Sequence, residues 1–396
     1  MNLADSEEMS AHLIQRGYTP TEKLDEADLV LINTCTVRDH AEHRALSFLG
    51  RLRQWKRDKS GRRIIFAGCA AQRLGNKLKK IFPFLDLVSG AREIDQFAHL
   101  LDQNGFSIAT NTSFTSTQGV TGYVTIMRGC DFACSYCIVP AVRGPVKCLP
   151  AAEILHHAVE KAASGYPEIM LLGQTVNAWH ENTKTFADLL NEVSALPGVQ
   201  RVRFVSPHPA FITPQFLDAI ANNPKIAKHI HLPVQSGSTK VLKEMKRGYT
   251  REIVLEKIAA LKKIGFAIST DLIVGFPTET NADFEQTLSL VEQAGFSAAY
   301  CFKYSPRQGT PAAEMKLLDE KILEQRLDIL LNKVKGLAEA TYQQQVGKQV
   351  QVLMETSHKG RTSENLWLQT QKSYTIGSMI QSEVMATEGT LLLTRD

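Results

Sequence analysis

The sequence has 396 residues, of which 43% are hydrophobic and 22% are charged. This is the composition of a globular protein with length for two or three domains, and it excludes disordered, fibrous and miniature disulfide-rich proteins. No stretch approaches the ~20 apolar residues that a membrane helix needs, and acids occupy the place of a signal peptide's apolar core. We therefore expect a soluble, cytoplasmic protein with no membrane partner. The 45 basic residues barely outnumber the 41 acidic ones, so net charge alone does not indicate a nucleic-acid partner.

The first hundred or so residues alternate short apolar strands with helical segments. Strands are predicted at Leu29–Asn33, Arg63–Ala67 and Asp86–Ser89, and His40–Arg57 has the leucine spacing of a helix. Such an alternation predicts a parallel sheet. We expect residues 1–105 to form an N-terminal, flavodoxin-like βαβ domain.

Two single cysteines directly follow predicted strands of this region. Cys35 comes after the first strand and Cys69 after the second. Because the carboxyl ends of parallel strands meet at one edge of a sheet, we expect the two thiols to converge. The alternative is a pair of ordinary buried thiols, since free cysteine is among the most buried residue types.

Six predicted strands alternate with helical segments in the middle of the chain. They follow a stretch rich in Thr, Ser, Asn and Gly, residues 107–118, which has the composition of a linker. Six βα units predict a partial parallel (β/α)6 barrel over residues 119–340, with its active site at the carboxyl ends of the strands. The strands are Tyr123–Met127, Glu168–Leu172, Val202–Val205, Ile230–Val234, Ala267–Val274 and Ala299–Tyr304.

The C-terminal region is predicted to be a small β-barrel. A long helical stretch, Asp319–Gln345, precedes it, and short alternating strands with turn residues fill residues 342–396. Over residues 341–396 five basic residues balance five acidic ones. Charge therefore does not mark this region as RNA-binding.

Three cysteines, Cys130, Cys134 and Cys137, lie within one short loop after the first predicted barrel strand. They are one thiolate short of a closed structural zinc site or a fully ligated 4Fe–4S cluster. A cluster held this way leaves its fourth iron open to the amino and carboxylate groups of S-adenosylmethionine. An electron from the cluster can then cleave the sulfonium and give a 5′-deoxyadenosyl radical. The alternative is a zinc loop completed by His156, His157 or Cys148.

Here the sequence resembles the radical SAM methylthiotransferases over nearly its whole length. The residues of the matching stretches are most similar to those of the branch that makes 2-methylthio-isopentenyladenosine in tRNA. The stretches are Met1–Glu7, Ile32–Arg38, Ala67–Cys69, Arg128–Pro140, Leu171–Gln174, His231–Gly237, Asp271–Pro277 and Tyr304–Arg307.

The resemblance implies a methylthiotransferase N-terminal domain, a radical SAM partial barrel and a C-terminal TRAM-like domain. It implies that Cys130, Cys134 and Cys137 hold the radical-generating 4Fe–4S cluster, and that Cys35 and Cys69 belong to a second, auxiliary cluster. Two molecules of S-adenosylmethionine, a tRNA substrate and an electron-donor protein complete the expected partners. The rival functions are methylthiolation of threonylcarbamoyladenosine in tRNA or of a ribosomal protein, and a catalytically silent iron-sulfur RNA-binding protein.

The sequence departs from the family pattern at two places. The family's first auxiliary cysteine stands in a Cys-Gln-Met-Asn run, and this chain begins at the Met of that run. Either the auxiliary cluster lacks a ligand, or the start was assigned to an internal methionine, which we favour. Farther on, Cys148-Leu149-Pro150 stands where the family usually has Ser-Arg-Pro, which removes a positive charge.

Four residues are candidates for binding the cofactor at the barrel mouth. Tyr136 could contact the adenine of S-adenosylmethionine, although core packing explains it equally well. Gly173, Gln174 and Gly275 could line the cofactor because glycine permits close approach, although barrel turns explain the glycines nearly as well.

Three further features have ordinary structural explanations beside the functional one. Cys148 and Cys301 are expected to be plain thiols, and His208 an incidental loop histidine. The run Arg51–Arg63 contains seven cations that could bind phosphates, or that could form a solvated helix end.

Overall fold

The computed structural model describes residues 1–36, 39–106 and 119–394. The expected linker over residues 107–118 lies outside this part of the chain. The chain divides into two compact units. The first comprises residues 1–116, 128–131 and 137–146, and the second comprises residues 117–127, 132–136 and 147–396. Each unit is described separately below.

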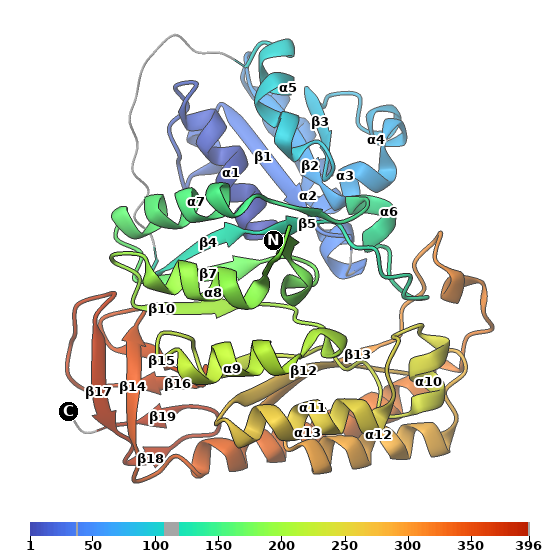
Figure 1. Cartoon of the computed structure of the whole chain (residues 1–396). Coiled ribbons are helices and arrows are strands. Elements are labelled where there is room, and N and C mark those ends of the chain that lie inside the picture. The colour runs from blue at the N-terminus through green and yellow to red at the C-terminus, as the bar shows by residue number, and fades with distance from the viewer. Residues whose placement is uncertain (37–38, 107–118, 395–396) are drawn as a thin grey trace. The chain divides into compact units, whose positions relative to one another are not determined.

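The first unit is a three-stranded parallel sheet between two layers of helices (Figure 1). The strands, in spatial order, are β1 (Leu29–Thr34), β2 (Arg63–Gly68) and β3 (Leu87–Gly90). The helices are α1 (Asn2–Ile14), α2 (Asp39–Asp58), α3 (Cys69–Leu74), α4 (Asn76–Ile81), α5 (Phe97–Gln103) and α6 (Val139–Arg143). The predicted flavodoxin-like βαβ fold is confirmed.

Alternating residues of β2 supply both cores of this unit. Ile65 packs with Met9 of α1 and Phe97 of α5, whereas Ile64 and Phe66 belong to a second core with leucines of α2 and α4. Successive side chains of a strand point to opposite faces of the sheet, so one continuous apolar strand buries both layers.

The second unit contains the six predicted parallel strands, in two sets of three. One set is β4 (Thr121–Thr125), β7 (Glu168–Leu172) and β10 (Arg201–Phe204), and the other is β11 (His229–His231), β12 (Ala267–Val274) and β13 (Ala298–Lys303). A parallel bridge between Val202 and Ile226 links β10 to the segment before β11. The predicted partial (β/α)6 barrel is confirmed. The strand β11 is shorter than expected because Pro233 has no N–H to continue the ladder.

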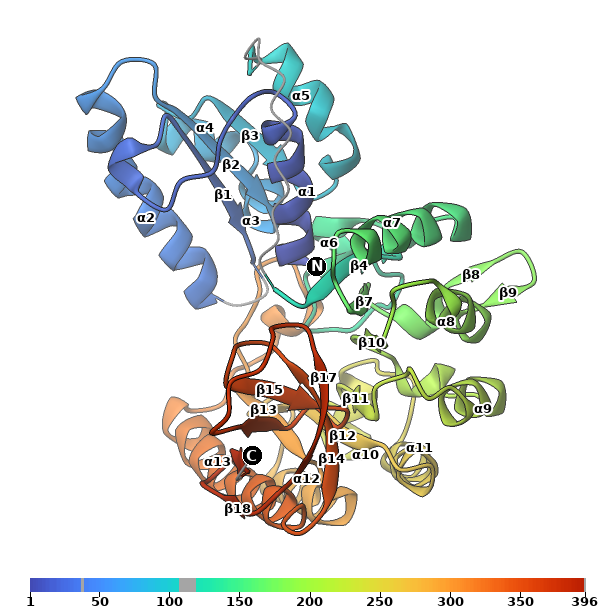
Figure 2. The same cartoon turned by 90° about the vertical axis from the view of Figure 1, so that its left-hand side faces the viewer.

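Helices cover the outer side of these strands (Figure 2). They are α7 (Ala151–Ala163), α8 (Phe186–Ala195), α9 (Pro214–Asn222), α10 (Thr239–Glu244), α11 (Arg251–Lys263), α12 (Asn281–Ala294) and α13 (Glu320–Gln343). Four short strands occupy the loops, namely β5 (Met127–Arg128), β6 (Lys147–Cys148), β8 (His180–Glu181) and β9 (Lys184–Thr185). Within the described ranges no helix is long and apolar enough to cross a membrane.

The C-terminal region, which was predicted to be a small β-barrel, is one six-stranded sheet that forms a half-barrel with its own apolar core. In spatial order its strands are β17 (Met379–Glu383), β14 (Gln349–Met354), β15 (Lys359–Thr362), β16 (Trp367–Gln369), β19 (Leu392–Leu393) and β18 (Ala386–Thr387).

A buried ionic cluster joins this sheet to the barrel. Glu168 of β7 accepts hydrogen bonds from Arg201 and Arg203 of β10, and the side chains of all three are at most 6% exposed. Both arginines also donate to the carbonyl of Thr362. Burial alone would raise the pKa of Glu168, but the two guanidinium groups outweigh it and lower that pKa.

Candidate active site

The cysteine loop follows the first barrel strand, as predicted, and other barrel elements hold its middle, residues 132–136. The Ser135 N–H donates to the carbonyl of Met245 at 3.1 Å, and the Ser135 hydroxyl donates to the carbonyl of Glu244 at 2.8 Å. The Ser135 carbonyl accepts from the N–H of Ala312 at 2.8 Å. Phe132 stacks on His208 with ring centroids 4.3 Å apart. Elements that are distant in sequence thus fix this stretch of loop.

Cys134 is buried and contacts an arginine. Arg247 Nη1 donates to Cys134 Sγ at 3.3 Å, and the arginine is only 8% exposed. The same guanidinium donates through Nε to the Tyr249 hydroxyl and through Nη2 to the Pro233 carbonyl. Sequence reading missed this pair because 113 residues separate its members.

Cys130 and Cys137 belong to the first unit, where a second set of contacts holds the loop ends. The Cys130 N–H donates to the carbonyl of Gly144 at 3.1 Å. Gly129 has φ +77°, and a side chain there would stand 2.0 Å from the carbonyl oxygen of Pro145, so only glycine fits before the first cysteine. Among the residues that the structure describes, no three His, Cys, Asp or Glu side chains already lie close enough together to hold a metal ion.

Cys35 and Cys69 directly follow neighbouring parallel strands. Thr34 of β1 and Gly68 of β2 are register partners, so the cysteines come one residue later at the same edge of the sheet. Their thiols interact electrostatically, and burial, the largest cause, raises the pKa of Cys69. Cys69 is 3% exposed and packs against Ile138 and Val142, which follow Cys137 in the chain.

A network of charges that sequence reading missed reaches Cys69 through Arg143. Arg143, at the end of α6, interacts electrostatically with the Cys69 thiol and donates to Asp5 of α1 at 2.7 Å. Asp5 also accepts from Arg128 at 2.8 Å, and Arg128 donates to Glu8. In the sequence, the only sign of this network is that each of its charged residues stands close to one of the matching motifs. The network lies within the first unit and ties α1 to the segments on either side of the cysteine loop.

The predicted cofactor residues lie at or near the carboxyl ends of the barrel strands. Close packing explains why two of these positions are glycines. A side chain on Gly173 would stand 2.4 Å from Met127, and one on Gly275 would stand 2.4 Å from Leu323. Tyr136 packs against the core of Val241, Met245, Phe276, Tyr304 and Ala312. Gln174 differs from these, because its buried side-chain oxygen has no hydrogen-bond partner within the described structure. Such an orphaned acceptor can bind a donor of a ligand.

His208 was expected to be an incidental loop histidine, but it is buried and its backbone is held by hydrogen bonds. It is 5% exposed, and Asn177 brackets its backbone by accepting from its N–H and donating to its carbonyl. Burial, with a smaller effect from Arg247, lowers the pKa of His208 to about 3, so the ring is neutral at physiological pH. Its Nδ1 accepts from the N–H of Ala210, and its buried Nε2 has no hydrogen-bond partner in the part of the chain that the structure describes.

Cys148 and Cys301, the two remaining cysteines, lie in β-strands of the second unit. Cys301 lies in β13, where burial raises the pKa of its thiol to about 11. Cys148 is half-buried in β6. That both are plain thiols stays a prediction.

Most cations of the run Arg51–Arg63 have structural partners. Lys56 binds Asp86, Lys59 binds Asp28, Arg62 donates to the carbonyls of Trp55 and Asp25, and Arg63 donates to the carbonyls of Asn104 and Gly105. These contacts favour the structural explanation of the run over a phosphate-binding surface.

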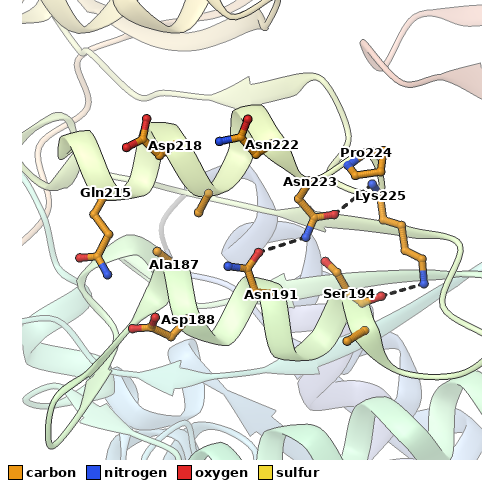
Figure 3. A pocket seen from close by; sticks show the side chains of 12 residues that line it. Ala187, Asp188, Asn191, Ser194, Gln215, Asp218, Asn222, Asn223, Pro224 and Lys225 are labelled. Atoms are coloured by element: carbon orange, nitrogen blue, oxygen red, sulfur yellow. Dashed lines mark hydrogen bonds between the residues drawn. The ribbon is translucent and has the colours of Figure 1, made fainter.

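The groove between α8 and α9 has a volume of about 620 Å³ and contains none of the predicted site residues (Figure 3). Asn191 and Asn223 hydrogen-bond across it, and Lys225 donates to the carbonyl of Ser194. It lies between outer helices, whereas barrel chemistry occurs at the carboxyl ends of the strands. We therefore place the candidate site at the cysteine loop.

Comparisons with known proteins identify the family of the chain. Residues 124–291 match the radical SAM superfamily, and residues 1–90 match an uncharacterized protein family, UPF0004. A curated protein of Koribacter versatilis, named tRNA-2-methylthio-N(6)-dimethylallyladenosine synthase, is 38% identical over 97% of this chain and 91% of its own length. A protein of the same name from Geobacter metallireducens is 41% identical over 85% of this chain and 80% of its own. The chain belongs to this radical SAM methylthiotransferase family.

Solved structures support the fold of this methylthiotransferase. The radical S-adenosylmethionine methyltransferase TsrM of Kitasatospora setae superimposes with a TM-score of 0.56 at 15% identity, covering 74% of this chain and 67% of its own. At that identity the likeness establishes the fold alone. As a radical SAM enzyme, the methylthiotransferase uses a 4Fe–4S cluster and S-adenosylmethionine.

Proposed function

We propose that this enzyme converts isopentenyladenosine next to the anticodon of tRNA to its 2-methylthio derivative. The observation that carries the proposal is the three-thiolate loop after the first barrel strand, in a chain whose curated relatives carry that name over nearly its whole length. We also propose the three-part division into residues 1–105, 119–340 and 342–396. Its tRNA substrate places the enzyme in the cytoplasm.

Cys130, Cys134 and Cys137 would hold the radical-generating cluster. Three thiolates suit iron better than a closed zinc site, because they leave one position open. When bound, this group supplies the electron that cleaves S-adenosylmethionine and yields a radical able to abstract hydrogen. The protein's own contribution is to fix the loop through Ser135 and Phe132, and to hold Cys134 beside a permanent cation.

The cofactor would lie at the barrel mouth among Tyr136, Gly173, Gln174 and Gly275. The orphaned side-chain oxygen of Gln174 suits an ammonium donor such as the amino group of S-adenosylmethionine. The close packing at Gly173 keeps the turn after β7 compact, which holds Gln174 at the end of its strand.

Cys35 and Cys69 would hold the auxiliary cluster that takes part in sulfur delivery. Both thiols lie at one sheet edge. Burial raises the pKa of Cys69, and the positive charge of Arg143 partly offsets this effect. A thiolate is the form that ligates iron. A separate protein would donate the electrons.

The target adenine must leave its stack to react, because a radical abstracts hydrogen only at contact distance. An isopentenyl group adds apolar surface, at ~0.8 kcal/mol per buried methylene, and so favours the modified base over plain adenosine.

The test is an anaerobic assay with reconstituted protein, S-adenosylmethionine, a reductant and tRNA carrying isopentenyladenosine, adenosine or threonylcarbamoyladenosine. We expect the methylthio product from the isopentenylated tRNA. Product only from the threonylcarbamoyl tRNA would move the assignment to that rival. Cofactor cleavage with no modified nucleoside from any tRNA would contradict a tRNA substrate.

A further inference from the structure

The contact between Arg247 and Cys134 extends this proposed function and rests on it. We propose that Arg247 is a positioning residue that donates a hydrogen bond to the Cys134 thiolate and thereby raises the reduction potential of the loop cluster. Nothing in the loop's own sequence encodes this interaction, since the donor comes from the segment after α10.

The backbone around Arg247 fixes where its side chain begins. The helix α10 ends at Glu244, and Lys246 adopts a left-handed conformation with φ +56°. The N–H of Arg247 then donates back to the carbonyl of Leu242 at 3.0 Å, which closes the helix end. The same helix end receives the two hydrogen bonds from Ser135. The arginine and the residue after Cys134 are therefore anchored to one element.

Three partners on the guanidinium leave it little freedom. Nε donates to the Tyr249 hydroxyl at 2.7 Å, Nη2 to the Pro233 carbonyl at 3.0 Å and Nη1 to Cys134 Sγ at 3.3 Å. The Tyr249 hydroxyl in turn donates to the carbonyl of Val234 at 3.1 Å. Because two other hydrogen bonds already fix the planar guanidinium, the side chain loses little further conformational entropy when it donates to the sulfur. The contact is therefore preorganised.

The group facing the sulfur keeps its charge. An arginine guanidinium cannot be deprotonated in proteins, and that of Arg247 donates directly to Cys134 Sγ. A buried cation without an anion is costly, and Cys134 would supply one in the thiolate form that ligates iron.

The electrostatics give the sign of the effect. Reduction adds one negative charge to a cluster, and a cation in contact with a ligand sulfur stabilises the reduced form more than the oxidised one. Hydrogen bonds to the sulfurs and the charge around a cluster are among the features that set its potential. Removing the guanidinium should therefore make reduction harder.

The experiment measures the midpoint potential of the loop cluster by EPR-monitored redox titration. The full chain carries Cys35→Ala and Cys69→Ala, so that only the loop contributes a signal. We expect Arg247→Gln to lower the reduced-to-oxidised ratio at a fixed applied potential about tenfold, which is 59 mV for a one-electron couple. Arg247→Lys, which keeps a charge, should recover part of this shift. Arg251→Gln is the matched control, because Arg251 bonds to the carbonyls of Gly237 and Gln286 and should leave the potential unchanged.

A purely structural role for Arg247 would change iron content or thermal stability without changing the potential of clusters that assemble. Arg247→Gln clusters that titrate as in the parent would overturn the inference. If that variant loads no iron, Arg247→Lys decides, because its cluster should still titrate at a lower potential than that of the parent. A parental potential in Arg247→Lys would then overturn the inference. A parent protein that binds no 4Fe–4S cluster at all would instead contradict the proposed function.

Discussion

Cys35 and Cys69 lie at the same edge of the first unit's sheet because the residues before them, Thr34 and Gly68, are paired in parallel register. Gly68 is required for this arrangement, since a side chain there would stand 2.3 Å from Asn33 Oδ1 and 2.6 Å from the carbonyl oxygen of Thr34. The pair is separate in sequence from the three-cysteine loop, so the two sets of thiols can be altered independently.

This separation predicts a division of labour. Cys134→Ala should abolish reductive cleavage of S-adenosylmethionine, whereas Cys69→Ala should still cleave the cofactor but form no methylthio product. The measurement is 5′-deoxyadenosine and modified nucleoside from the same reaction. Equal loss of cleavage in both variants would show that the roles are not divided.

Removing Glu168 should destabilise the protein strongly. Glu168→Gln removes the carboxylate that binds the buried Arg201 and Arg203, and breaking such a cluster costs about 3–5 kcal/mol of unfolding free energy. Glu192→Gln, which removes the partner of the more exposed Lys184, should cost at most about 1 kcal/mol. Denaturant unfolding of the apoproteins measures both. Equal losses would mean that the buried cluster contributes no more than a surface pair.

His208 should make folding sensitive to acid. Its pKa is about 3 in the folded chain and roughly 6.5 when unfolded, so the unfolded state binds a proton between these values that the folded state does not. The contribution of neutral His208 to the free energy of unfolding is therefore fully present above pH ~6.5. As the pH drops below that value, the free energy of unfolding falls by up to about 1.4 kcal/mol per pH unit. His208→Gln apoprotein should show a shallower loss between pH 7 and pH 5 in urea unfolding. An unchanged slope would show that His208 protonates freely in the folded protein.

Cys301 should resist alkylation. With its pKa raised to about 11, its thiolate fraction at pH 8 is on the order of hundreds of times smaller than that of an ordinary cysteine. Mass spectrometry after brief iodoacetamide treatment should find Cys301 unlabelled in the native apoprotein and labelled in urea. Equal labelling in both states would contradict the burial of this thiol.

The strands were predictable because each is a short apolar run whose neighbours read clearly as helices or turns. Their parallel order also predicted that Cys35 and Cys69 share one edge. The helix α1 was not predicted, because four consecutive polar residues interrupt the helical spacing of its apolar residues. These four are Asp5, Ser6, Glu7 and Glu8. The burial of His208 was missed because two prolines flank it and indicate an exposed loop. The partners of the cysteines, Arg143 and Arg247, come from distant segments, and no local pattern records such contacts.

The substrate is the central claim, and the nucleoside profile of total tRNA tests it most directly. We predict that deleting the gene removes 2-methylthio-isopentenyladenosine and leaves its unthiolated precursor to accumulate. The gene supplied on a plasmid should recover the product, and the same gene with Cys134→Ala should not recover it. An unchanged profile after deletion, or loss of the threonylcarbamoyl analogue in its place, would contradict the account.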